Sequence, residues 1–263
     1  MITWEAGGHV RNSTLRLLHY WWPLALGWSL TVVIERATGR PPDAAGLLVL
    51  LAGIAAAYSV DRLIDPPAQP DALWLRILLC AAAVASAVAG AVATWRLPVQ
   101  TSVLVPLLGV TSLGYPRLKH RLVTKLFVLP LVWTWAVVAL PFNDGSWFGW
   151  HVLQLPVTMP LMLLISAGCL LCDLKDEAAD RAAGVATVPA VFGRRAALAV
   201  ATALLVAAAT VAALEHRSAV ALGAAALGVS TLSPALLATD AVGPLLIDML
   251  LTLPGVLIAA RVV

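Results

Sequence analysis

Three aspartates that follow a long apolar run are the residues in this sequence best suited to chemistry. Asp173, Asp176 and Asp180 lie in the segment CDLKDEAADRAAGVATVPAVFG, residues 172–193, directly after the apolar run 161–171. Their i, i+3, i+7 spacing predicts that they share one face of a helix. Neighbouring carboxylates repel one another, and each costs roughly 2.5 to 3.5 kcal/mol at mid-bilayer on insertion scales. Mg²⁺ offsets such charge through carboxylates, water and substrate phosphates, so we expect a Mg²⁺ site here rather than a solvated acidic turn.

A second acidic segment, AAYSVDRLIDPPAQPD at residues 56–71, supports the same interpretation. Asp61 and Asp65 are spaced i, i+4, which places them on one helix face. Arg62 lies between them, either in a local salt bridge or as a further cation for a ligand. Two acidic clusters predict two metal positions that face each other across a cavity. Diphosphate fits between them, because metals bridge its oxygens and neutralise the leaving charge.

A basic segment between the acidic clusters offers cations for the same ligand. It reads Tyr115-Pro-Arg-Leu-Lys119-His-Arg121. Lys119 provides a point charge and Arg121 a planar fork for phosphate oxygens. Tyr115 can hydrogen-bond a phosphate or present its ring face to a developing carbocation. The alternative is a basic cluster that serves membrane topology alone.

Composition excludes a soluble protein. The chain is 61% hydrophobic and only 12% charged, whereas soluble domains carry about 25% charged residues. We therefore expect an all-α, polytopic membrane protein formed as a single domain over residues 1–263. No basic run indicates nucleic acid binding, and Cys80, Cys169 and Cys172 lie in or beside apolar segments, where helix packing is the expected role.

The apolar runs predict about nine transmembrane helices. They are residues 16–36, 45–61, 72–94, 99–115, 124–141, 155–172, 195–214, 219–238 and 244–262. With nine spans, twelve of the seventeen Lys and Arg residues fall on the side of the N-terminus and the acidic segments. Because positive charge favours the cytoplasmic side, we expect that side to be cytoplasmic, in a bacterial inner membrane.

The acidic motifs resemble those of the UbiA superfamily of intramembrane prenyltransferases. The similarity rests on D-x-x-D-x-x-x-D at 173–180, followed by R-x-x-G and T-x-P, and on Tyr115-x-x-x-Lys119. It extends over essentially the whole chain. It implies a helical bundle around a central cavity open to lipid. It also implies Mg²⁺-dependent ionisation of an isoprenyl diphosphate and attack by a lipophilic, often aromatic, acceptor.

The resemblance assigns roles to individual residues. Asp61 and Asp65 would hold one metal, Asp173 and Asp176 the other, and Asp180 would be a further ligand or position the acceptor. Lys119 would bind the diphosphate. The further diphosphate-binding candidates are Arg121, Lys175, Arg181 and Arg62.

The first motif departs from the pattern N-D-x-x-D-x-x-x-D that is usual in the superfamily. Ala57 and Tyr58 stand where that pattern has Asn and Asp, which weakens one metal site or reshapes the pocket. Two alternatives to an acceptor-prenylating enzyme therefore remain. One is a terpene cyclase of the same fold, and the other is a non-enzymatic transporter or lipid-binding protein.

Overall fold

The computed structural model describes residues 5–64, 73–118, 124–143, 145–147, 151, 154–239 and 242–263. Within these ranges the side chains of 5–19, 113, 115–118 and 124–125 are not described.

Every regular element in the described ranges is a helix, as the composition predicts. The long helices are α1 (Glu5–Thr38), α2 (Ala44–Ile64), α3 (Leu73–Thr94), α5 (Leu104–Leu118), α6 (Leu129–Ala139), α8 (Thr158–Cys172), α11 (Arg194–Leu214), α12 (Ser218–Ser230) and α14 (Val242–Ala259). The short ones are α4 (Val99–Ser102), the π-helix η2 (Thr124–Val128), α9 (Glu177–Ala183), α10 (Val188–Phe192) and α13 (Pro234–Leu237).

Each predicted span coincides with a helix or with two adjoining helical segments. Four described helices, α2, α3, α11 and α14, are long and apolar enough to cross a membrane, or five if the bent pair α8–α9 forms one span. The other spans match α1 or shorter apolar helices, so the count of nine crossings stays a prediction. The eighth span differs: it was expected to reach residue 238, but α12 ends at Ser230 and Pro234 begins α13. Proline disfavours helical geometry in the residue before it, which explains the break.

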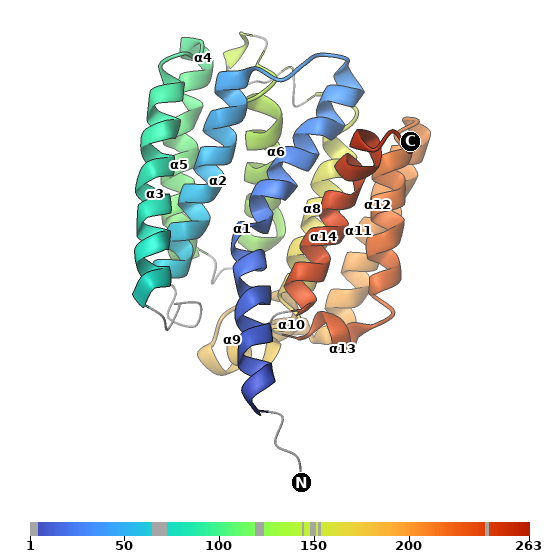
Figure 1. Ribbon diagram of the computed structural model, residues 1–263. Helices are drawn as coiled ribbons and strands as arrows, with labels where there is room; N and C mark the ends of the chain where they lie inside the picture. Colours follow the sequence, from blue (N-terminus) through green and yellow to red (C-terminus); the bar gives the residue numbers. More distant parts are fainter. Residues whose placement is uncertain are drawn as a thin grey trace.

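The helices form one bundle with the α2, α3 and α5 group at one side and α11 and α12 at the other (Figure 1). On α3 the large apolar side chains Leu73, Ile77, Val84 and Val88 are exposed. Such a surface is unfavourable in water and suits lipid contact. On α11, by contrast, the buried face consists mainly of small residues: Ala197, Ala201, Leu205, Ala208 and Ala212. Small side chains let membrane helices approach closely, and α11 packs against α8 in this way.

The first and last helices are joined by hydrogen bonds within the bundle. Ser29 on α1 donates its hydroxyl to the carbonyl oxygen of Thr252 on α14 at 2.7 Å. The same hydroxyl accepts the backbone N–H of Gly255 at 3.1 Å. A side chain at Gly255 would overlap the backbone of Ser29, so only glycine permits this approach. Nearer the N-terminal end of α1, Trp22 Nε1 donates to Thr252 Oγ1 at 3.0 Å.

The short helices α9, α10 and α13 gather at the end of the bundle where α1 begins (Figure 1). The C-terminal end of α1 and the C-terminus of the chain lie at the opposite end. The acidic segment that follows α8 therefore belongs to the first end.

Candidate active site

The second acidic motif is divided between two helices rather than carried by one. Asp173 caps the C-terminal end of α8, Asp176 precedes α9, and Asp180 lies within α9. The axes of α8 and α9 differ by 76°. The expectation that the three carboxylates share one helix face is therefore wrong. The turn tightens through i to i−3 bonds from Leu174 N to Leu171 O and from Asp176 N to Asp173 O, at 3.2 Å each.

Asp173 and Asp176 differ in their environments. Asp173 is buried, with 6% of its surface exposed. Asp176 is more open, and both of its carboxylate oxygens accept hydrogen bonds from Lys175 Nζ at 2.6 and 2.7 Å. Lys175, a predicted diphosphate ligand, thus neutralises Asp176 in this structure.

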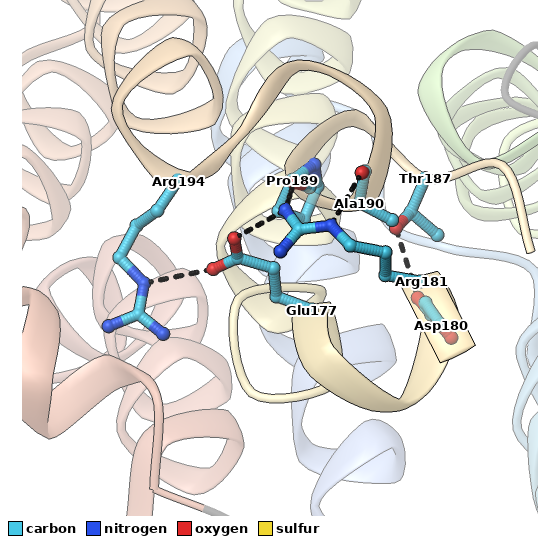
Figure 2. A network of polar contacts seen from close by, with 7 residues as sticks. All are labelled: Glu177, Asp180, Arg181, Thr187, Pro189, Ala190 and Arg194. Atoms are coloured by element: carbon cyan, nitrogen blue, oxygen red, sulfur yellow. Dashed lines mark hydrogen bonds and ion pairs between the residues drawn. The ribbon is translucent and has the colours of Figure 1, made fainter. Parts of the chain in front are cut away.

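A network of polar contacts fixes α9 against α10 and α11 (Figure 2). Glu177 accepts from Arg181 Nη2 at 2.9 Å and from Arg194 Nε at 3.2 Å. Arg181 also donates Nε to the carbonyl of Ala190 at 3.2 Å. Arg181, predicted to bind diphosphate, is therefore engaged by Glu177 and by the α10 backbone.

The R-x-x-G and T-x-P elements receive a structural explanation from the same region. Gly184 ends α9 at φ +70°, a left-handed conformation that glycine adopts without strain. Thr187 is buried and donates its hydroxyl to Asp180 Oδ2 at 3.0 Å. Pro189 lies in the first turn of α10, where its missing N–H costs no helical hydrogen bond. The sequence analysis gave no role to Glu177 or to Thr187 of the T-x-P element, although both fix the orientation of this motif.

The first acidic segment is described only in part. Asp61 lies in the last turn of α2 and is partly buried, while Asp65 lies outside the described residues. The guanidinium of Arg62 lies over the ring of Tyr20 on α1, with Cζ 5.3 Å from the ring centroid. The sequence left a local salt bridge or a cation for a ligand as the alternatives for Arg62. The structure adds a cation–π contact with Tyr20.

Tyr58, the residue that departs from the usual first motif, faces the interior of the bundle. Its ring packs edge-on against Trp133 of α6, with centroids 6.3 Å apart and planes at 68°. Trp133 belongs to α6, which also packs against α8, the helix whose C-cap is Asp173. Tyr58 precedes Asp61 by three residues on α2, so α6 contacts both helices that carry the acidic segments.

Asp248 is a candidate that the sequence reasoning missed. It is a partly buried carboxylate within the apolar helix α14. Two neighbouring contacts fix its position. Leu251, three residues later, packs against Gly168 of α8, and Thr252 accepts a hydrogen bond from Trp22 of α1. Asp248 lies one turn from both, on the face directed at α1 and α8. The available signal was an ionisable residue inside a membrane span, which is rare and usually functional.

The basic segment lies mostly outside the described residues. Lys119 and Arg121 lie outside the described residues. Tyr115 belongs to α5, but its side chain is not described. Their roles at a diphosphate therefore stay predictions.

The carboxylates suit magnesium in type, but the described part of the chain holds no preformed cage of ligands. Within the described ranges no group of three or more His, Cys, Asp or Glu side chains is arranged to hold a metal. Asp65 lies outside these ranges. Mg²⁺ is usually bound through one or two carboxylates with water and substrate phosphates, so a cage is not required. The oxygen donors of Asp61, Asp173 and Asp176 fit that mode of binding.

Comparison with known proteins agrees with this arrangement. The profile of the UbiA prenyltransferase family matches residues 68–244, about two thirds of the chain. No curated protein matches. The apo structure of a UbiA homolog from Aeropyrum pernix K1 superimposes with a TM-score of 0.63 at 18% identity, over 90% of this chain and 98% of the other. That likeness shows the shared fold, and the profile match shows more: the chain belongs to the UbiA prenyltransferase family.

Proposed function

We propose that this protein is an intramembrane prenyltransferase. It moves an isoprenyl group from its diphosphate to a lipophilic, aromatic acceptor and releases diphosphate. Family membership supports a transferase of prenyl groups. The observation that carries the proposal is that two apolar spans, α2 and α8, end at the same end of the bundle (Figure 1), one in the partly buried Asp61 and the other in the buried Asp173.

Residues at different depths in the bundle would bind different parts of the substrate. At the cytoplasmic end, Asp61, Asp173 and Asp176 would receive the diphosphate head group together with its cations. Thr187 holds Asp180 at that end through its hydroxyl. One turn deeper, Tyr58 and Trp133 present aromatic surface to the prenyl group. Aromatic faces attract cations, and the apolar spans exclude water that would quench an allylic cation.

Magnesium has one role in the proposal. Bound by the aspartates, Mg²⁺ would neutralise the charge of the departing diphosphate. Lys175 already neutralises Asp176 in the structure, so substrate binding would require that ion pair to open or to turn toward the diphosphate.

The test uses purified full-length protein with prenyl diphosphates of several lengths and a panel of lipophilic acceptors. Diphosphate release and prenylated product are measured together, with and without Mg²⁺. We expect Asp173→Asn to lower turnover about 100-fold or more, as is typical when one preorganised electrostatic group is lost. Glu215→Gln is the matched control, because Glu215 is an exposed carboxylate at the other end of the bundle.

The outcomes separate the alternatives. A cyclic hydrocarbon or alcohol formed without an acceptor would identify a terpene cyclase of the same fold. Equal turnover of wild type and Asp173→Asn, both folded by size-exclusion chromatography, would refute the proposal. Cation flux in liposomes without diphosphate chemistry would favour a transporter.

A further inference from the structure

A cavity of about 220 Å³ lies between the C-terminal ends of α1 and α14 and the turn that joins α11 to α12. These helix ends lie at the end of the bundle opposite the acidic motif (Figure 1). Arg36, His216 and Arg217 line its polar side, and Val33, Val220 and Ile258 line its apolar side. It is smaller than the roughly 300 to 1,000 Å³ of pockets that enclose a drug-sized ligand. A head group fits it better than a whole prenyl substrate.

Two arginines line the cavity, which also includes Val263, the last residue of the chain. No acidic side chain lines it. Within the part of the chain that the structure describes, neither Arg36 nor Arg217 forms a salt bridge. Arg217 donates Nη2 to the carbonyl of Ala37 at 3.3 Å, which fixes its guanidinium at the cavity wall. Its Nε is buried and has no acceptor among the described atoms. Buried donors normally have a partner, so an oxygen-bearing ligand is expected here.

The backbone adds donors to the same place. The first intrahelical bond of α12 runs from Ala221 N to Arg217 O at 3.1 Å. The N–H groups of the three residues 218–220 therefore have no intrahelical acceptor. No side chain caps this helix end, and all three residues line the cavity. Free N–H groups beside guanidinium groups favour an anion.

We propose that this cavity binds a phosphate group, with Arg217 as the fixed donor and Arg36 as the second cation. A phospholipid head group and free phosphate would offer this site the same phosphate oxygens. In the predicted orientation the cavity opens toward the outer leaflet. It is separate from the diphosphate site, because it lies at the other end of α1 and α14. The proposal therefore does not depend on the enzymatic function.

Native mass spectrometry of the full-length protein in neutral detergent tests the proposal. Three ligands are titrated: phosphatidylglycerol, inorganic phosphate, and a galactolipid that has acyl chains but no phosphate. We expect Arg217→Gln to weaken binding of the phosphate-bearing ligand about tenfold or more, and Arg36→Gln to weaken it less. Arg40→Gln is the matched control, since Arg40 lies at the same end of α1 but does not line the cavity.

A second variant keeps the proposal testable if Arg217→Gln does not fold. Ser218→Asp places a carboxylate in the first turn of α12, where negative charge favours the helix. It also introduces repulsion toward a phosphate, so we expect a folded protein with at least tenfold weaker binding.

The three ligands distinguish a phospholipid head group from free phosphate as the source of the bound phosphate. Displacement of phosphatidylglycerol by inorganic phosphate would support a free phosphate site. Binding of phosphatidylglycerol that phosphate cannot displace would support a lipid site. Equal binding by wild type, Arg217→Gln and Ser218→Asp would overturn the proposal, as would a galactolipid that binds as tightly as phosphatidylglycerol.

Discussion

The contact between Ser29 and Gly255 is predicted to control the stability of the α1–α14 pair. In Gly255→Ala, the new methyl group would overlap the hydroxyl, the carbonyl oxygen and the Cα of Ser29. The backbone of α1 cannot rotate away as a long side chain would, so the helices must separate. Separation also breaks the two hydrogen bonds that Ser29 makes to Thr252 and Gly255.

The expected change in the free energy of unfolding is the sum of the lost hydrogen bonds and the steric overlap. Hydrogen bonds between membrane helices average about 0.6 kcal/mol each, which gives about 1 kcal/mol for the pair. Overpacking a well-packed site costs roughly 1 to 3 kcal/mol. We therefore expect Gly255→Ala to lower the free energy of unfolding by about 2 to 4 kcal/mol. Ser29→Ala, which removes the hydroxyl without adding volume, should cost only about 1 kcal/mol. The steric effect is thus the larger one.

Reversible unfolding in SDS-containing mixed micelles measures these free energies. Gly109→Ala is the matched control, because an added Cβ at this helical position of α5 meets no atom within 4 Å. Alanine is favoured over glycine in a helix, so this variant should be neutral or more stable by up to about 1 kcal/mol. Gly255→Ala and Gly109→Ala of equal stability would refute the close approach of α1 and α14.

Three further predictions concern the candidate site. Thr187→Val should lower turnover and speed amide hydrogen exchange in α9, because Asp180 loses a donor worth about 1.5 to 3 kcal/mol; Thr187→Ser should restore both, and a Ser variant as impaired as Val would contradict it. Glu177→Gln should speed amide hydrogen exchange in α9 and lower the free energy of local opening by less than about 1 kcal/mol, since both of its arginine partners are largely exposed. The difference from wild type should shrink in 1 M salt, and a salt-independent difference would refute the ionic explanation. Asp248→Asn should lower turnover about tenfold or more if, as we propose, a carboxylate within the apolar bundle stabilises positive charge on the prenyl group; unchanged turnover in a folded variant would exclude that role.

The fold was predictable where it depends on apolar run length. A run of about 20 apolar residues must form a helix in a bilayer, since lipid satisfies no backbone hydrogen bonds. The boundaries of α2, α3 and α11 therefore fall within a few residues of the predicted spans. The end of α12 differs from the prediction. Hydropathy alone extended the predicted span past Pro234, whereas the helix ends before that residue.

The candidate site was predictable in composition but not in geometry. Asp173, Asp176 and Asp180 are conspicuous as charges after an apolar run, yet helical periodicity placed them on one face. The structure bends by 76° within the motif. The contacts that position α9, from Glu177 to Arg194 and from Thr187 to Asp180, are tertiary. Such contacts depend on how the chain returns on itself, which residue spacing does not encode.

Asp248 was missed for a different reason. The two motifs were found by comparing neighbouring residues, whereas Asp248 is a single carboxylate without acidic neighbours in sequence. Its significance arises from the register between α14 and α8, which the contact of Leu251 with Gly168 fixes. Small residues determine that register, because the axes of membrane helices approach each other where glycine or alanine permits. Close packing therefore places a lone charge on the face of α14 directed at α1 and α8. It follows that Gly168→Leu should impair turnover as Asp248→Asn does, although residue 168 carries no chemistry itself. A Gly168→Leu variant that folds with wild-type turnover would show that this register does not matter to the site.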